Sequence, residues 1–523
     1  MRNNIIAVLA SVLLLSAGWL RFSGLTLVVA LVPLLIISNR YGPSKRDWWK
    51  MAGWTLLTFT LWYTATSWWI WNSTAPGAVV AIIVSALLFT AAFMLYHYVS
   101  KRAPKALAYC ILVSVWIAAE YWYLSGEVSF PWLILGNGFA NDTWAIQWYE
   151  WTGVFGGSLW VLVCNILFFE TWLRFSRRRM VLSLTLLLLP PALSLVMFAT
   201  YREPEPKVGI TVVQPNFSCF PIEEKFTVSE EQQLQIFHGL IAQAPEWSRF
   251  AILPETAVGT QRIIWENDWN ASSVAAMYRM QRELMPSGQI ITGANTARYY
   301  PDPALASTTA RRDNGNCYDV YNTALAFDST GMSGVRHKIK LVVGAEKVPY
   351  PKLMEALSFL IVELGGTSGQ LGVDRHPVNF QLDSIRIGAA ICYESVYGDF
   401  FADFVRRGAN VMSVITNDGW WGDTPGHRQH FSYSRLRAIE TRRSIARSAN
   451  TGISGFINGR GDVISTLGWD RRGTLSEQIA LNDRITFYTR YGDYIARIAC
   501  YVLLLSVLYY VAYRVRKRNH LVD

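Results

Sequence analysis

Long apolar segments are the feature that most constrains this chain. Eight runs of mostly apolar residues interrupt its 523 residues, and most have the ~20 residues that a helix needs to cross a bilayer. The chain is 51% hydrophobic and only 16% charged, whereas soluble domains carry about 25% charged residues. A large part of it is therefore predicted to lie in a membrane. The runs cover residues 4–20, 23–38, 52–71, 77–98, 106–124, 158–174, 180–198 and 494–513.

The first two runs leave more than one interpretation open. They are short and are separated only by Arg21, Phe22 and Ser23, so they form either two spans or one re-entrant hairpin. Residues 1–20 alone also have the length of a cleaved signal peptide. Because a second apolar run follows at once, the signal-peptide interpretation is disfavoured, and we expect about eight spans.

Basic residues alternate between successive loops and predict the orientation of the chain. The loops after the second, fourth and sixth runs and the C-terminal tail carry several basic residues, whereas the loops after the third and fifth runs carry none. Lysine and arginine accumulate on the cytoplasmic side. Both termini are therefore predicted to be cytoplasmic, and the segment between the seventh and eighth spans to lie outside the cytoplasm. The basic residues are Arg40, Lys45, Arg46, Lys50, Lys101, Arg102, Lys105, Arg174, Arg177, Arg178, Arg179, Arg514, Arg516, Lys517 and Arg518.

The net charge of +10 does not indicate nucleic-acid binding. Residues 1–200 carry +7 of it and residues 514–523 carry +3, whereas residues 201–513 are neutral overall. The positive charge thus belongs to the membrane portion, where it sets orientation. No basic surface for a nucleic acid is expected.

Residues 201–490 predict a separate domain. Charged residues become frequent there, and short apolar strands alternate with helical stretches at 228–245 and 270–285, which is typical of an α/β sandwich. We therefore expect a transmembrane domain over 1–200, the α/β domain over 201–490, and a last span with a basic tail over 491–523. The predicted strands are 208–214, 249–255, 288–294, 321–328, 385–394 and 409–418.

Three reactive side chains lie at or just after predicted strands. Glu255 and Cys392 each close a strand, and Lys338 follows another; at such strand ends a rigid scaffold positions active-site residues. A cysteine needs a base to become a thiolate because its free pKa is about 8.5. Glu255 suits the role of base, and Lys338 suits that of an oxyanion stabiliser. From spacing alone, a core cysteine, a turn glutamate and a solvated lysine remain the ordinary interpretation.

The motifs around these residues resemble the nitrilase (carbon–nitrogen hydrolase) superfamily. They are LPETA around Glu255, RHKIKLVVGAE around Lys338, ICYES around Cys392, and TNDGWWGD at 416–423 with HRQHFSYSRLRAIETRR after it. Their combination is specific, whereas any single motif is not. With spans on both sides, the chain resembles the apolipoprotein N-acyltransferase family over nearly its whole length. Further resemblance lies in SFPWLILGNGF (129–139), EWTGVFGGSLW (150–160) and TFYTRYGDY (486–494).

The resemblance implies an αββα sandwich with a Glu–Lys–Cys triad. Position by position, Cys392 corresponds to the nucleophile, Glu255 to the general base and Lys338 to the residue that stabilises the oxyanion. Other residues near them correspond to supporting positions of the family. These supporting residues are Glu346, Tyr393 and Glu394.

The segment after Lys338 departs from the family pattern. Lys340 competes for the lysine role, but the K-x-x-L-V alignment and the spacing to Glu346 favour Lys338. Family members usually have V-P-F-G-E, whereas residues 342–346 of this chain are V-V-G-A-E. Losing the proline and moving the glycine is expected to change the loop backbone, which leaves the position of Glu346 open.

The resemblance also implies a two-step acyl transfer in the bacterial inner membrane, with the catalytic domain on the periplasmic side. The Cys392 thiolate takes an acyl chain from a membrane phospholipid. The diacylglyceryl-cysteine α-amine of an apolipoprotein then accepts it, so the kinetics are ping-pong. No metal or other cofactor is implied. His427 and His430 lack a matching pair with zinc-ligand spacing, and a loop role is expected for them.

Two other function classes remain open. A membrane-tethered amidase or nitrilase hydrolysing a C–N bond shares the triad but has no use for eight spans, and an inactive nitrilase-like scaffold is disfavoured by the three intact residues. Trp420 and Trp421 are candidates for acyl-chain contact, the alternative being that they pack the domain against the membrane. The sequence does not decide acyl-chain or headgroup preference, lipoprotein clients, oligomeric state, or whether Cys219 and Cys317 pair.

Overall fold

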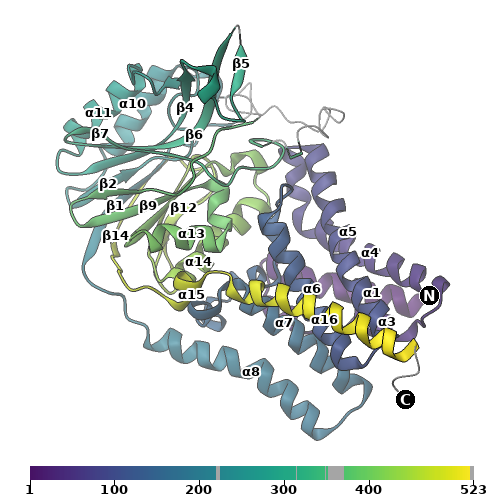
Figure 1. The fold of residues 1–523 in the computed structure, drawn as a ribbon. Helices are drawn as coiled ribbons and strands as arrows, with labels where there is room; N and C mark the ends of the chain where they lie inside the picture. Colours follow the sequence, from purple (N-terminus) through teal and green to yellow (C-terminus); the bar gives the residue numbers. More distant parts are fainter. Residues whose placement is uncertain (220–223, 314, 348, 351–369, 519–523) are drawn as a thin grey trace. The chain divides into compact units, whose positions relative to one another are not determined.

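The computed structural model describes residues 1–219, 224–313, 315–347, 349–350 and 370–518 (Figure 1). The chain divides into two compact units. The helical unit comprises Met1–Trp71, Ala78–Tyr201 and Tyr491–Asp523. The α/β unit comprises Asn72–Gly77 and Arg202–Arg490. The last helix of the chain therefore belongs to the same unit as the N-terminal helices.

Six helices are long and apolar enough to cross a bilayer, counting only the described residues. They correspond to the first and to the fourth through eighth predicted runs, and their segments of 18 to 26 residues match the thickness of a bilayer. The chain is thus a membrane protein with several candidate spans. The helices are α1 (Arg2–Ser16, extended by a 3-10 turn to Trp19), α5 (Ala75–Ser100), α6 (Lys105–Ser125), α7 (Tyr149–Leu173), α8 (Arg177–Thr200) and α16 (Tyr494–Arg518).

The second and third predicted runs do not meet the same criteria, so within the described chain the candidate spans number six instead of about eight. The run at 23–38 is broken into η2 (Gly24–Thr26), α2 (Leu27–Ala30) and α3 (Val32–Arg40). These pieces are too short to span singly. The run at 52–71 falls largely within α4 (Lys45–Ser67), whose five threonines and four tryptophans make it less apolar than the other long helices.

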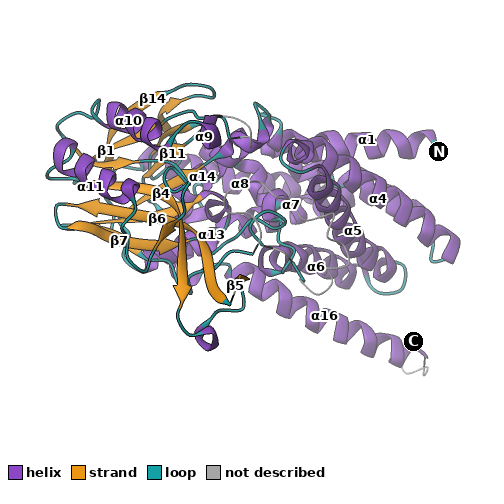
Figure 2. Ribbon diagram, turned by 90° about the horizontal axis from the view of Figure 1, so that it is seen from above, coloured by secondary structure: helices purple, strands orange, loops and turns teal. Residues whose placement is uncertain are grey.

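Two sheets form the α/β unit (Figure 2). The eight-stranded sheet has the order β14-β1-β2-β4-β6-β5, with β3 paired to β4 and β7 paired to β6; the six-stranded sheet has the order β13-β12-β11-β10-β9-β8. Strands β1, β2 and β4 run parallel, as do β9, β10 and β11, so their carboxyl ends share one edge of each sheet. The strands are β1 (Lys207–Gln214), β2 (Ser248–Ile252), β3 (Ile264–Trp265), β4 (Gln289–Tyr300), β5 (Arg311–Asp313), β6 (Asn316–Asp328), β7 (Gly331–His337), β8 (Asn379–Leu382), β9 (Ile385–Ile391), β10 (Val411–Thr416), β11 (Ile445–Ala449), β12 (Ser454–Ile457), β13 (Val463–Leu467) and β14 (Gly473–Ala480).

Alternating side chains along each strand build four layers. Residues such as Ile210 on β1 and Ile387 on β9 form a core between the two sheets. The opposite face of the larger sheet packs against α10 (Glu230–Ile241) and α11 (Ser272–Leu284), and that of the smaller sheet against α13 (Gly398–Arg406) and α14 (Pro425–Thr441). Each fully buried Ile, Val or Leu stabilises the fold by roughly 1.5–3 kcal/mol. The predicted αββα sandwich is confirmed (Figures 1 and 2).

All six predicted strands and both predicted helices are present, but their ends differ. Strand β4 continues to Tyr300, and β9 stops before Cys392, whose φ of +50° is a left-handed value that ends an extended strand. Eight strands were not predicted, namely β3, β5, β7, β8 and β11–β14. Several of their positions are occupied by polar residues such as Arg447, Ser465 and Glu477, so their apolar alternation is weak.

Candidate active site

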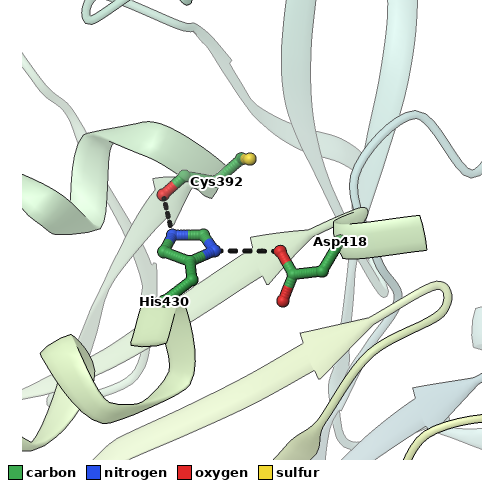
Figure 3. A group of neighbouring side chains, drawn as sticks. All are labelled: Cys392, Asp418 and His430. Carbon is green, nitrogen blue, oxygen red and sulfur yellow. Dashed lines mark hydrogen bonds and ion pairs between the residues drawn. The ribbon is translucent and has the colours of Figure 1, made fainter. Parts of the chain in front are cut away.

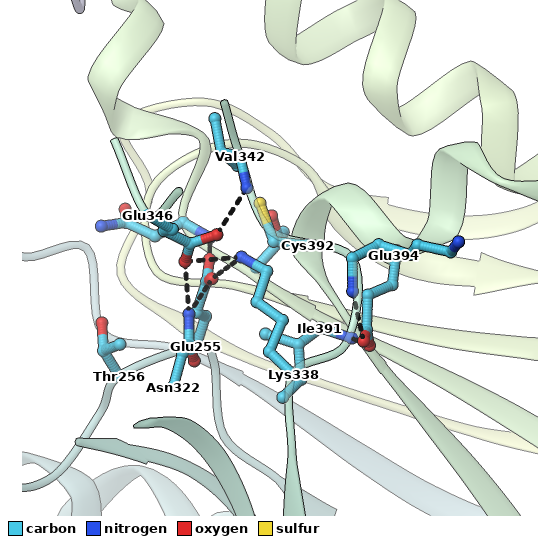
Figure 4. Close-up of polar contacts among 12 residues, drawn as sticks. Glu255, Thr256, Asn322, Lys338, Val342, Glu346, Ile391, Cys392 and Glu394 are labelled. Carbon is cyan, nitrogen blue, oxygen red and sulfur yellow. Dashed lines mark hydrogen bonds and ion pairs between the residues drawn. The ribbon is translucent and has the colours of Figure 1, made fainter. Parts of the chain in front are cut away.

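The three predicted reactive residues meet at strand ends of the α/β unit (Figure 4). Glu255 lies in the turn after β2, Lys338 directly follows β7, and Cys392 directly follows β9. Their exposed fractions are 6%, 1% and 8%. Since polar groups buried to this degree must find partners within the protein, their contacts define the chemistry of the site.

The Lys338 ammonium lies between two carboxylates. Its Nζ is 2.9 Å from Glu255 Oε1 and 2.9 Å from Glu346 Oε1. The Asn322 side chain on β6 donates Nδ2 to the same two oxygens at 2.8 and 2.9 Å, and the Asn417 backbone N–H donates to Glu255 Oε2 at 3.0 Å. Three donors therefore hold the Glu255 carboxylate in one orientation. Sequence analysis missed both asparagines, although Asn417 lies in the TNDGWWGD motif.

This arrangement determines the resting protonation states. Burial raises the pKa of the Glu255 carboxyl, but the charge and hydrogen bond of Lys338 outweigh it, so the pKa lies below its usual range. Burial lowers the pKa of Lys338, but the two carboxylates outweigh it and raise the pKa well above its usual value. Burial and the Glu255 charge raise the pKa of the Cys392 thiol, against the smaller influence of Lys338. The resting site thus holds an ammonium, a carboxylate and a neutral thiol.

The loop after Lys338 still brings Glu346 into contact with the lysine. Gly344 has a φ of +88°, which a glycine adopts without steric cost. The Glu346 N–H donates to the Val342 carbonyl at 2.9 Å, and the Val342 N–H donates to Glu346 Oε2 at 2.9 Å. The moved glycine thus makes a tight turn, and the family's proline is not needed to position this carboxylate. Lys340 points elsewhere, with its Nζ 5.2 Å from the Tyr397 ring centre.

A buried ion pair ties the lysine segment to the cysteine turn. Arg336 on β7 donates to both carboxylate oxygens of Glu394, at 2.7 and 2.6 Å, and both side chains are fully buried. Glu394 also accepts from the backbone N–H groups of Ile339 at 2.7 Å and Ile391 at 2.8 Å. The predicted supporting residue Glu394 therefore contacts both segments. Tyr393, also buried, packs edge-on against Tyr397 with ring centres 5.3 Å apart.

Replacing Glu394 by alanine is expected to lower the free energy of unfolding of the α/β unit by about 3–5 kcal/mol, because the Arg336 charge remains buried and loses its carboxylate. Asp483→Ala is the matched control: it breaks the exposed Arg386–Asp483 pair of 3.1 Å and is expected to cost less than about 1 kcal/mol. Denaturant unfolding of the two variants measures the difference. Equal losses would contradict a supporting role for Glu394.

The prediction of a loop role for His427 and His430 was wrong. The His430 ring lies next to the backbone of the Cys392 turn (Figure 3). Both histidines belong to α14 and are buried. His430 Nε2 is 3.2 Å from the Cys392 carbonyl oxygen and 3.0 Å from Ser395 Oγ. The two histidines are three positions apart, so they share one side of the helix, a periodicity that the loop interpretation overlooked.

Asp418 and Arg447 fix the orientation of the His430 ring. Arg447 donates to Asp418 Oδ2 at 2.7 Å, and its Nη2 lies 2.9 Å from His430 Nδ1. His430 Nδ1 also lies 2.9 Å from Asp418 Oδ1, so the carboxylate and the guanidinium on one side and the Cys392 carbonyl on the other hold the ring in one orientation. Burial and the Arg447 charge lower the pKa of His430, which keeps the ring neutral. The ligand-type atoms of Cys392, Asp418 and His430 lie within 4.8 Å of one another, but hydrogen bonds already engage the ring nitrogens and the carboxylate.

The two tryptophans of the TNDGWWGD motif lie next to this network. Trp420 and Trp421 belong to η10 (Asp418–Trp421), directly after β10, and both are half-buried. The Trp421 ring meets His430 edge-on with ring centres 5.5 Å apart. Cys219 and Cys317 are both buried, and the structure does not join them by the disulfide that the sequence left open.

Comparison with known proteins assigns both parts of the chain to families. Residues 210–487 match the carbon-nitrogen hydrolase family, and residues 11–167 match the N-terminal domain of apolipoprotein N-acyltransferase. The chain is 30% identical over 508 residues to an apolipoprotein N-acyltransferase of Chlorobaculum tepidum, covering 94% of this chain and 92% of the relative. It is 26% identical over 543 residues to that of Geobacter metallireducens, covering 99% and 97%.

Solved structures of the nitrilase superfamily are similar to the chain over part of its length. Nit3 of Saccharomyces cerevisiae has a TM-score of 0.38 at 15% identity and covers 54% of this chain and 92% of its own. A carbon-nitrogen hydrolase of Helicobacter pylori has a TM-score of 0.37 at 11% identity and covers 56% and 93%.

Proposed function

We propose, because this chain belongs to the apolipoprotein N-acyltransferase family, that its acyl donor is a membrane phospholipid and its acceptor is the N-terminal diacylglyceryl-cysteine of apolipoproteins. The chain is an acyltransferase. The observation that supports the residue roles is the buried cluster of Glu255, Lys338 and Glu346 beside Cys392. The amidase and inactive-scaffold alternatives are disfavoured because relatives matched over nearly the full length are acyltransferases by name.

In the first half-reaction the Cys392 thiol transfers its proton to the Glu255 carboxylate as Sγ attacks the ester carbonyl carbon of the phospholipid. Glu255 acts as a base during the attack, since the resting cysteine is a thiol. Lys338 uses two of its three N–H groups for carboxylates of the described site, and its third stabilises the oxyanion. The ester C–O bond then breaks, and the leaving lysophospholipid oxygen takes the proton from Glu255.

In the second half-reaction the α-amine nitrogen attacks the thioester carbonyl, and Glu255 takes one proton from it. The C–S bond breaks, the thiolate of Cys392 leaves, and it regains the proton. The products are an N-acylated lipoprotein and the free enzyme, so a thioester on Cys392 is an obligatory intermediate.

Mass spectrometry of the acceptor tests this function directly. Purified full-length protein is incubated with phospholipid vesicles and a diacylglyceryl-cysteine peptide, and the peptide is expected to gain one acyl chain on its α-amine. A matched peptide with an acetylated α-amine should remain unchanged. Acyl loss to water in place of transfer would favour the hydrolase alternative.

We also propose that the protein lies in the bacterial inner membrane with both termini in the cytoplasm and residues 201–490 in the periplasm. The basic residues at 101–105, at 174–179 and in the C-terminal tail, and their absence from residues 125–157, support this orientation. A reporter that is active only in the cytoplasm should be active when fused after Asp523. The same reporter inserted after Pro206 should be silent. Equal activity at both sites would contradict the orientation.

Trp420 and Trp421 are proposed to contact the acyl chain. A large aromatic side chain buries roughly 150–250 Å². At ~25 cal/mol per Å², losing one such contact is expected to cost on the order of a few kcal/mol of binding free energy. Trp420→Ala and Trp421→Ala should therefore lose thioester formation with long-chain phospholipid but retain it with a very short-chain donor. Equal loss with both donors, or a fall in folded protein, would assign these side chains to packing.

A further inference from the structure

Lys225 is a second buried lysine directed at the site, and it has no role in either of the two half-reactions. It lies on the short helix α9 (Glu224–Thr227), and its side chain is only 3% exposed. Its backbone N–H donates to the Ser218 carbonyl at 2.9 Å, and its carbonyl accepts from Gln233 Nε2 at 3.0 Å. These two bonds anchor the lysine backbone between β1 and α10.

The Lys225 ammonium reaches the turn that carries the proposed base. Its Nζ donates to Thr256 Oγ1 at 2.5 Å and lies 3.4 Å from the Glu255 carbonyl oxygen. Thr256 has a φ of +49°, a left-handed value that is costly for a β-branched residue. Lys338 binds the carboxylate of Glu255, whereas Lys225 binds its backbone and the next side chain. The two lysines therefore restrain different parts of the same residue.

Lys225 also balances the charge of the buried cluster. Glu255, Glu346 and Lys338 together carry one net negative charge, and a protonated Lys225 makes the group neutral. The groups that face Lys225 are Glu255 with Thr256 after β2, Cys219 after β1, and Cys392 after β9. An excess buried charge is strongly unfavourable, and when the thiol proton moves to Glu255 the negative charge appears on Cys392 instead. A nearby ammonium favours that charged form.

We propose that Lys225 is a positioning residue of the acyl transfer, which holds the Glu255–Thr256 turn in place and offsets the carboxylate charge next to Cys392. This role rests on the proposed function of Glu255 as the base that takes the proton from the Cys392 Sγ. Burial lowers the pKa of Lys225 to about 8, an effect that the nearby Glu255 charge partly offsets. Its ammonium is thus present below that pH and lost above it.

The test measures the rate of thioester formation on Cys392 against pH, with full-length protein and phospholipid vesicles. The parent rate should fall as the pH rises through about 8, because Lys225 loses its charge there. Lys225→Met should be slower at pH 7 by about tenfold or more, the equivalent of one pKa unit of the thiol, and should lack the fall near pH 8. Lys225→Arg should keep most of the rate and remain active above pH 8, since arginine stays charged.

The control is Lys207→Met, which removes an exposed lysine at the start of β1 and should keep the parent rate and pH profile. If either Lys225 variant fails to fold, as judged by its unfolding temperature, Thr256→Val removes only the acceptor hydroxyl and should also slow thioester formation at pH 7. A parental rate and pH profile in Lys225→Met, or in Thr256→Val where it replaces that variant, would overturn the proposal. Failure of the proposed function itself is distinguished by Cys392→Ala, which in that case would still yield product.

Discussion

Cys392→Ala is expected to abolish both the acyl-enzyme and the N-acylated product. Loss of the nucleophile in enzymes with a covalent intermediate lowers kcat by on the order of 10⁶, because no other group forms the thioester. Cys392→Ser should also show no appreciable turnover. A hydroxyl is a far weaker acid than a thiol, and the pKa of Glu255 lies below its usual range, so this carboxylate is a poor base for serine. Intact-protein mass spectrometry after incubation with phospholipid measures the acyl-enzyme.

Cys317→Ala is the matched control for the cysteine variant. Cys317 is also a buried free thiol. It lies near the start of β6, opposite Tyr300 at the end of β4, and takes part in none of the contacts described for the site. This variant should acquire the acyl chain at the parental rate. N-acylated product from Cys392→Ala would show that the thioester mechanism is wrong.

Glu255→Gln is expected to lower the rate of thioester formation by about 10²–10⁴-fold, the range attributed to a positioned general base. The amide keeps the size of the carboxylate but cannot accept the thiol proton, and it leaves Lys338 with only one carboxylate partner. The burst of thioester in a rapid-quench experiment gives this rate without contribution from the second half-reaction.

The rate of thioester formation in this experiment should also depend on pH through the protonation of Glu255. Because the pKa of Glu255 is depressed, the carboxylate remains ionised below the ordinary glutamate value of about 4.3. The acid-side fall in rate is therefore expected only below that pH. Glu346→Gln is the comparison variant: it also removes a carboxylate from Lys338 but leaves the base in place, so its loss should be smaller. An equal or larger loss in Glu346→Gln would contradict the assignment of Glu255 as the base.

Several features of the fold depend on local sequence and were predictable. The length of an apolar run limits which helices can span, and the period of apolar positions distinguishes the strands from the helices α10 and α11. The same local view overestimated the spans, because it did not weigh the threonines and tryptophans of α4 or the breaks that divide residues 24–40 into η2, α2 and α3. It also missed β3, β5, β7, β8 and β11–β14, since these strands are short or carry polar residues that obscure the alternation.

For the site, the residue types and motifs determined which side chains were candidates, and the structure places them together. Lys338 and Glu255 are 83 residues apart in the chain, and Asn417 and Glu255 are 162 apart, so no local pattern contains their contacts. The selection of Lys338 over Lys340, the position of Glu346, the ring orientation of His430 and the direction of Lys225 were all decided by tertiary structure. The physical reason is that burial removes water as a partner, so each of these polar groups takes whichever donor or acceptor the packing of the two sheets brings within reach.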